Sequence, residues 1–491
     1  VHVDSVQLAG DAERAEVWVR YEDELPRNGD PADSTTTAAA SPLDAKNAKA
    51  KYQLQGQNIQ AQLVRRGETM IVEHIIVDGE VTFREFDITD NLAERTSILG
   101  DIVQVEDADK PHTRVRVQGQ PARISARGME VVGNSVQLDR GYNHVWIAGP
   151  GEMVLAGEAL ASARRSEGAL KSELTGPARV SWQGRMDFDG RTARFSEQVR
   201  LQATETTRTG ERHDLDALGQ QLAVTLTHPV DFSRPRQHPE TKLAKAAFAG
   251  SVFLQNRGSQ AGEPVSYERM QVQNLTIEQT TGQLHADGPG WGSTVRYDSQ
   301  GVGSGLPGTR TAAKPAHREQ LVFVRVDFED ELVGQLEDRQ SVFHGRVRTI
   351  YGPVAGWQDQ LQPDPLDGLT DDQILLSSDQ LLVADMGSRT SGEPAAIEMV
   401  ASGNASIEGR EFSAQGWRIS YARAKELVVL EGDGRNDAEL WMRGSTTPDA
   451  AAQQLRFWTN DMSIQVDGGR FLNLGQLGAM GGGQLWPSSQ P

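Results

Sequence analysis

Apolar and polar residues alternate along much of the chain, most clearly in segments that end in glycine. In residues 136–151, VQLDRGYNHVWIAGPG, the apolar positions Val136, Leu138, Val145 and Ile147 flank a polar turn. Successive side chains of a strand point to opposite faces, so a spacing of two places these residues on one face. The segment therefore predicts a β-hairpin with one apolar face, followed by a sharp Gly-Pro-Gly bend.

The same pattern occurs twice more without a gap. Residues 275–290, LTIEQTTGQLHADGPG, follow the first copy at an offset of 139 (275 − 136), and residues 419–434, ISYARAKELVVLEGDG, at an offset of 283 (419 − 136). Looser relatives lie at 186–201 and 455–469. One hairpin cannot bury its apolar face alone, so we expect the copies to stack. The apolar positions of the second and third copies are Leu275, Ile277, Leu284, Ile419, Tyr421, Val428 and Leu430.

Other segments also predict strands rather than helices. LVFVRVDF, residues 321–328, places Val322, Val324, Val326 and Phe328 on one face. Only residues 44–53 and 157–170 are candidates for short helices. The chain is therefore expected to be mainly β, with repeated units stacked into an elongated, curved sheet.

Stretches rich in Pro, Gly, Ser and charge divide the chain, and they predict its organisation. We expect an N-terminal strand segment at 1–22, a disordered linker at 23–50, β units at 51–230, 243–298 and 320–478, a linker at 299–319 and a flexible tail at 479–491.

Composition narrows the classes of function. The 491 residues include 50 glycines and no cysteine, which excludes disulfides and thiolate chemistry. The net charge of −19 repels a phosphate backbone, so we expect no nucleic-acid partner. The chain begins at Val1 rather than Met, and we expect a trimmed sequence whose targeting segment or anchor has been removed.

No segment carries a specific catalytic or metal motif. GSGLPG at 303–308 lies in a Pro-rich stretch without the strand and helix of a dinucleotide site. DFDG at 187–190 lacks the remaining ligands of a calcium loop, so a strand and turn are favoured, and DPLDGLTDD at 364–372 is favoured as an acidic loop. His144 and His285 have no second ligand at metal spacing. We therefore expect no enzyme activity, no metal and no cofactor.

Two longer runs have the same order of features. Residues 121–155 and 401–434 each contain a small-residue strand, then Ile124-Ser125-Ala126 or Phe412-Ser413-Ala414, then the glycine-terminated hairpin. This order resembles the OstA-like family of lipopolysaccharide-transport proteins (LptA and LptC). The resemblance covers about 300 residues in several segments, and the chain differs from the small members in carrying several units and long insertions.

The resemblance implies stacked β-jellyroll units whose two sheets form an open apolar groove for acyl chains. It implies a non-enzymatic lipid-binding bridge or scaffold for lipopolysaccharide transport, located in the periplasm or envelope. Its partners would be lipopolysaccharide or a similar lipid, and other OstA-like proteins that pair through edge strands. The residues expected to line the groove are Val136, Leu138, Val145, Ile147, Leu275, Ile277, Leu284, Ile419, Tyr421, Val428 and Leu430.

Three alternatives remain at this stage. The same apolar residues would fill the closed core of a structural envelope or surface protein that has only protein partners. A β-solenoid polysaccharide lyase would need a coil repeat of about 20–30 residues, whereas the spacing found here is near 140. A basic cluster of Arg114, Arg116, Arg123 and Arg127 is favoured as a solvated strand face over a phosphate site.

Overall fold

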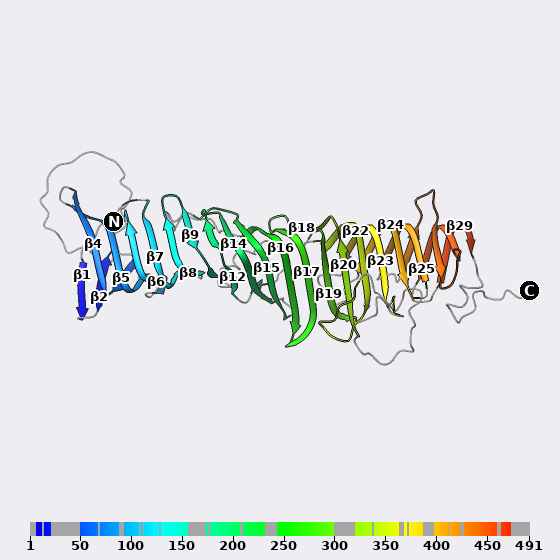
Figure 1. Cartoon of the computed structure of the whole chain (residues 1–491), viewed down its shortest axis with the longest axis horizontal. Coiled ribbons are helices and arrows are strands. Elements are labelled where there is room, and N and C mark those ends of the chain that lie inside the picture. Colours follow the sequence, from blue (N-terminus) through cyan, green and yellow to red (C-terminus); the bar gives the residue numbers. More distant parts are fainter. Residues whose placement is uncertain are drawn as a thin grey trace, which may run out of the picture. The chain divides into compact units, whose positions relative to one another are not determined.

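The computed structural model is an all-β antiparallel protein (Figure 1). It describes residues 6–11, 14–20, 50–66, 69–87, 93–107, 110, 112–126, 129–155, 173–174, 177–206, 210–230, 243–298, 320–335, 338–362, 368–370, 373–385, 397–410, 412–422, 427–458 and 463–472. The predicted linker at 23–50, except for Ala50, the predicted linker at 299–319, the predicted tail at 479–491 and the GSGLPG segment lie outside these residues.

The chain divides into two compact units. Unit 1 comprises Val1–Arg165, Leu174–Ala203 and Gln221–Leu243, and unit 2 comprises Ser166–Glu173, Thr204–Gln220 and Ala244–Pro491. The strands β11 (Glu173–Leu174) and β15 (Glu211–Leu226) are therefore each divided between the units.

The strands of unit 1 are β1 (Val6–Asp11), β2 (Arg14–Arg20), β3 (Ala50–Gly56), β4 (Asn58–Arg66), β5 (Thr69–Asp87), β6 (Ala93–Glu106), β7 (Arg114–Ala126), β8 (Met129–Asp139), β9 (His144–Ala148), β10 (Gly151–Leu155), β12 (Ala178–Trp182), β13 (Arg185–Phe188) and most of β14 (Thr192–Thr206).

The strands of unit 2 are β16 (Leu243–Gln260), β17 (Glu263–Glu278), β18 (Gln283–Asp287), β19 (Gly290–Asp298), β20 (Gln320–Phe328), β21 (Glu331–Gln335), β22 (Gln340–Pro353), β23 (Ile374–Asp385), β24 (Ile397–Gly409), β25 (Phe412–Ala422), β26 (Leu427–Glu431), β27 (Ala438–Met442), β28 (Ala450–Trp458) and β29 (Ser463–Leu472).

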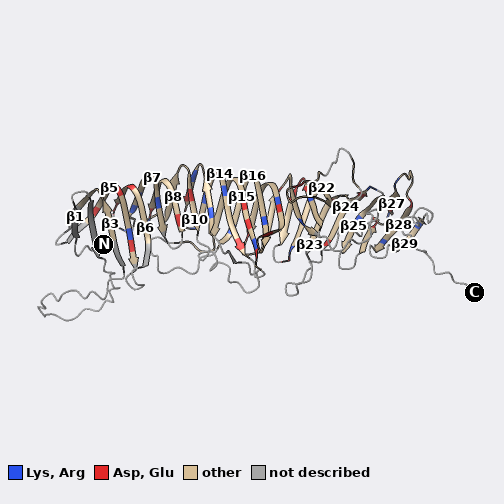
Figure 2. Ribbon diagram, turned by 90° about the horizontal axis from the view of Figure 1, so that it is seen from below, with Lys and Arg blue, Asp and Glu red and all other residues tan. Residues whose placement is uncertain are grey.

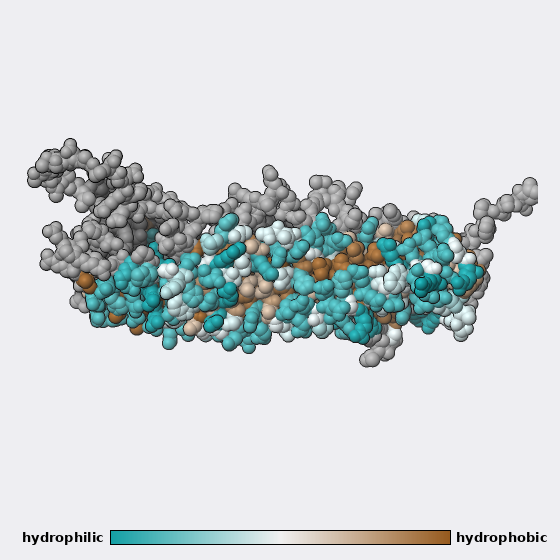
Figure 3. All heavy atoms as spheres, turned by 90° about the horizontal axis from the view of Figure 1, so that it is seen from above, coloured by the Kyte–Doolittle hydropathy of each residue, from teal (hydrophilic) through white to brown (hydrophobic). Residues whose placement is uncertain are grey.

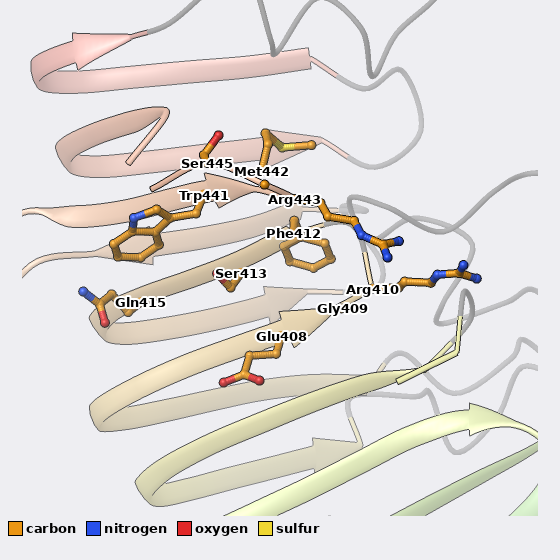
Figure 4. A pocket seen from close by; sticks show the side chains of 11 residues that line it. Glu408, Gly409, Arg410, Phe412, Ser413, Gln415, Trp441, Met442, Arg443 and Ser445 are labelled. Carbon is orange, nitrogen blue, oxygen red and sulfur yellow. The ribbon is translucent and has the colours of Figure 1, made fainter. Parts of the chain in front are cut away.

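Long strands bend sharply near their middle, at a position that we call the corner. The pairing register of β5 with β6 shifts between Asp78 and Val81, where Gly79 has a φ of 80°. The registers of β6–β7, β22–β23 and β24–β25 shift in the same way. A bulge with a residue in the left-handed region bends a strand and increases its twist. Each bend divides its strand into two arms, and Figure 4 shows strands of unit 2 folding back at these corners.

Some corners interrupt the strand altogether. Gly149-Pro150 separates β9 from β10, and Gly288-Pro289 separates β18 from β19. The two strands that such a corner separates still pair with one common strand. β9 pairs with residues Val136–Asp139 of β8, and β10 pairs with residues Met129–Gly133 of the same strand. The Gly-Pro-Gly segments therefore mark corners of the fold.

The best-buried side chains of unit 1 gather beside the corners. Trp182 and Phe195 are each 1% exposed, and their rings lie 5.1 Å apart. The indole nitrogen of Trp182 donates to the carbonyl of Gly149 at 3.1 Å, which satisfies its only polar group within the core.

One sequence prediction of local structure is wrong. The candidate helix at 44–53 overlaps β3, which begins at Ala50 and pairs with β2 and β5. The alternation of Tyr52 and Leu54 with polar residues suits a paired strand, and two neighbouring strands supply hydrogen-bond partners that override a weak helical preference. The other candidate, 157–170, lies outside the described residues.

Charged residues are spread along the strands of each unit (Figure 2). Arg114 pairs with Asp139 at 3.1 Å and Arg123 with Glu130 at 3.1 Å, while Arg116 donates to Gln137. These contacts agree with the solvated strand face favoured for this basic cluster, and Arg127 lies outside the described residues. Within the part of the chain that the structure describes, no helix is long and apolar enough to cross a bilayer.

Candidate functional site

The three predicted hairpins form, and the apolar residues of their two strands lie opposite one another. In β8–β9, Val136 faces Ile147 and Leu138 faces Val145. The equivalent pairs are Leu275–Ala286 and Ile277–Leu284 in β17–β18, and Ile419–Leu430 and Tyr421–Val428 in β25–β26. The inward-facing positions of each copy thus correspond along the chain.

Cross-strand pairing extends these positions into two continuous rows in unit 1. The row beside the corners, which we call the corner ladder of unit 1, consists of Val77, Val103, Val117, Val136, Ile147, Met186 and Phe195. The next row away from the corners, the rim ladder of unit 1, consists of Ile75, Val105, Val115, Leu138, Val145 and Phe188.

The two ladders of unit 1 differ in exposure. Every member of the corner ladder is at most 4% exposed, whereas every member of the rim ladder is only partly buried. Both ladders are on the same face of the same strands and consist of apolar residues. The difference in exposure therefore depends on the distance from the corner. Side chains beside the corner are packed on all sides, and those one row further away are partly open to solvent.

Unit 2 repeats this arrangement. Its corner ladder consists of Phe248, Leu275, Ala286, Leu332, Phe343, Leu381, Ala401, Ile419, Leu430 and Leu455. Its rim ladder consists of Ile277, Leu284, Gly334, Ser341, Val383, Met399, Tyr421, Val428 and Phe457. All eleven residues proposed from the sequence therefore lie in one of the four ladders.

The rim ladder of unit 2 changes along its length. Ile277, Leu284 and Tyr421 are partly exposed, whereas Val428 and Phe457 are 5% and 7% exposed. Figure 3 shows apolar residues in a strip between polar margins on one face of the molecule. The apolar face is thus accessible over the earlier strands and packed closed at β26–β28.

A glycine on the opposite arm also faces open space. Gly292 of β19 pairs with Val326 of β20, so it shares the inward face with Val322 and Val324. A Cβ atom added to Gly292 would meet no heavy atom within 4 Å, although Gly290 next to the corner would meet Phe328. Space therefore begins within two residues of the corner on this arm.

The inward face becomes polar at the far ends of β16 and β17. Asn256 lies beside Glu268 in the same cross-strand row as Val324, and its amide donates to the Glu268 carboxylate at 3.0 Å. His213 of β15 lies 3.4 Å from Asn256 and 3.5 Å from Glu211. The apolar lining of unit 2 is therefore bordered by hydrogen-bonding groups away from the corner.

Titratable groups on the outer face make ordinary structural pairs. His144 contacts Asp187 at 2.8 Å and stacks on Trp146, and His285 contacts Asp287 at 3.0 Å. The side-chain amide of Asn274 is the main cause of a lowered pKa at Asp287, and His285 lowers it further. Among the described residues, no cluster of three His, Asp or Glu side chains has the geometry of a metal site.

The DFDG segment forms a strand and a turn, as predicted. β13 ends at Phe188, and Asp189 accepts hydrogen bonds from the backbone amides of Arg191 and Thr192 at 3.0 and 2.7 Å. Its carboxylate thus holds the turn into β14. Most of DPLDGLTDD lies outside the described residues.

One apolar cluster of unit 2 was missed by the sequence analysis. Val295, Phe323, Ile350 and Leu375 lie on the outer face of β19, β20, β22 and β23, opposite the groove. They are covered by Val354, Trp357, Leu361 and Leu369 from the segment that follows β22. The sequence does contain a signal for this cluster. Both faces of 321–328 carry large apolar residues, which predicts that other parts of the chain pack against both faces of this strand.

Comparisons with known proteins give no further guide. No protein-family model matches the chain, and no curated protein is significantly similar to it. The geometry of the ladders is therefore the main basis for a functional conclusion.

Proposed function

We propose that the chain is a non-enzymatic lipid-binding bridge or scaffold that holds acyl chains against the rim ladders of its two units. The observation that carries this proposal is the gradient in unit 1, from a corner ladder that is at most 4% exposed to a rim ladder that is partly exposed throughout. Partly exposed apolar rows remain favourable sites for hydrocarbon, since each Å² of apolar surface removed from water contributes about 25 cal/mol.

The resemblance to OstA-like proteins supports a more specific role. On that basis the units are OstA-like jellyrolls, the ligand is lipopolysaccharide or a similar lipid, and the site of action is the periplasm or envelope. The terminal strands also fit a bridge: within the described residues, β1 pairs only with β2 and β29 only with β28. Their unpaired edges offer backbone groups for pairing with other OstA-like units.

The charge of the chain constrains where a head group would lie. A net charge of −19 disfavours anionic phosphates close to the surface. Glu211 and Glu268 at the far ends of the unit 2 strands add to this effect. Phosphates would therefore remain in solvent or be bridged by divalent cations.

The test is native mass spectrometry of the purified protein, with and without lipopolysaccharide. Val136 and Ile147 are poor positions for a charged substitution, because they are 1% and 0% exposed and a buried charge would unfold unit 1. Leu138→Asp is the better variant, since Leu138 is in the partly exposed rim ladder. Gln137→Asp is its matched control: it adds the same charge next door, on the outer face beside Arg116.

A lipid adduct that survives Gln137→Asp and is lost with Leu138→Asp, both folded by circular dichroism, is the expected result. An adduct unaffected by Leu138→Asp would place the lipid elsewhere. A folded protein with no adduct from lipopolysaccharide, and no lipid on organic extraction, would refute the groove and favour a structural envelope protein with a closed core.

A further inference from the structure

A hollow lies on the outer face of unit 2, on the side of the sheet away from the groove. Glu408 of β24 pairs with Ser413 of β25, and Ser413 pairs with Trp441 of β27, so the three side chains form one cross-strand row. Phe412 and Ala414, on either side of Ser413, point to the opposite face and are 5% and 2% exposed. The row is therefore separated from the groove by the sheet itself.

The hollow exists because a small residue stands between two large ones. Ser413 fills little of the space between the Glu408 and Trp441 side chains, and the Phe412 ring lies against Gly409 at the edge of the hollow. The cavity has a volume of about 460 Å³, within the range of small-molecule sites. Figure 4 shows Trp441 and Gln415 on one side of Ser413, with Arg410 and Arg443 on the other.

The lining combines the apolar surfaces of Trp441, Phe412 and Met442 with groups that make hydrogen bonds. The indole of Trp441 supplies an aromatic surface, while Ser413, Gln415 and Glu408 supply hydroxyl, amide and carboxylate groups. The Gln415 amide nitrogen donates to Glu439 at 3.0 Å, which fixes the orientation of its side chain. The carboxylate of Glu408 accepts hydrogen bonds, so it favours a ligand that presents hydroxyl donors.

We propose that this hollow binds a saccharide residue. One face of a pyranose ring carries C–H groups that pack on an aromatic ring, and its edge carries hydroxyls that suit Ser413, Gln415 and Glu408. A purely apolar ligand would leave these polar groups unpaired. The proposal does not depend on the lipid groove, since none of the residues that line the hollow belongs to a corner ladder or a rim ladder.

The experiment is saturation-transfer NMR of the whole chain with the methyl glycosides of glucose, galactose, mannose and N-acetylglucosamine. Trp441→Ala removes the aromatic surface, and Ser413→Leu fills the hollow from an outward-facing position without disturbing the core. Trp417→Ala is the matched control, because Trp417 is 52% exposed and lies outside the hollow.

At least one glycoside is expected to bind, with an affinity that falls at least about tenfold, or 1.4 kcal/mol, in Trp441→Ala and in Ser413→Leu. Trp417→Ala is expected to bind like the unmodified chain. The proposal is wrong if none of the glycosides binds, or if binding survives both substitutions in the hollow. Loss of binding in Trp417→Ala alone would move the saccharide site to that tryptophan and would equally overturn the proposal.

Discussion

Val117 and Val115 of β7 provide a matched test of the open groove. They are the same residue type, two positions apart on the same face, and belong to the corner ladder and the rim ladder of unit 1. Val117 is 0% exposed and lies between Val103 and Val136, whereas Val115 is partly exposed between Val105 and Leu138. Replacing either valine with alanine removes two methyl groups, from the buried corner ladder at Val117 and from the partly exposed rim ladder at Val115.

The expected costs follow from burial. Two buried carbons at about 0.8 kcal/mol each give about 1.6 kcal/mol. The cavity left in a packed site raises the cost of Val117→Ala to about 2–3 kcal/mol. Val115→Ala leaves no enclosed cavity, so we expect it to lower the free energy of unfolding by less than about 1 kcal/mol.

The assay is equilibrium unfolding in urea, followed by tryptophan fluorescence, since Trp182 reports on the core of unit 1. Added lipid should stabilise the unmodified chain and Val117→Ala by similar amounts, and Val115→Ala by less, because only Val115 would contact an acyl chain. Equal costs at both positions, with no response to lipid, would refute the open groove and indicate a core closed by the facing arm.

Further predictions concern the corners. Trp182→Ala should destabilise unit 1 by about 3–5 kcal/mol in urea unfolding, through the lost ring and an unpaired Gly149 carbonyl; a cost under about 1 kcal/mol would contradict the packing. Gly403→Ala should lower the melting temperature more than Gly210→Ala: both glycines have positive φ (75° and 81°), but only at Gly403 would the methyl group meet another side chain, that of Asp379. The backbone amides of Asn436 and Arg435 lower the pKa of Asp433. Its stabilising effect should therefore be present above its usual value of 3.8 and fade as pH falls through the lowered pKa; a melting-temperature difference between the unmodified chain and Asp433→Ala that is unchanged from pH 7 to 2 would refute this.

The hairpins could be predicted from the sequence because their signals are local. Alternation, a polar turn and a closing glycine all lie within 16 residues, and they are enough to place the apolar positions of each hairpin on one face. The pairs Val136–Ile147 and Ile277–Leu284 agree with that placement. The face of Val322, Val324, Val326 and Phe328 was predicted for the same reason and is confirmed by their cross-strand partners.

The corners and the outer-face cluster could not be predicted as readily. The corner of β14 falls at Glu197 and Gln198, which have φ values of 64° and 50° without being glycines. Nothing in the local sequence marks this bend, because neighbouring strands impose it. The cover of Phe323 by Trp357 depends on a contact between segments 34 residues apart (357 − 323), and periodicity contains no information about such contacts. The hollow at Trp441 depends on the register of β24, β25 and β27 and was missed for the same reason.

Each strand pairs with strands that are at most four places away in the chain, which makes these units nearly one-dimensional in their energetics. An interface between adjacent strands contributes stability that depends little on strands several places away, so unfolding should proceed by fraying from an end or opening at a weak joint. Evolution can then change the length of such a unit by gaining or losing a pair of strands, about 9.6 Å at a time, without altering how the remaining strands pack. The length of such a unit can therefore evolve separately from its stability and from the chemistry of any one site.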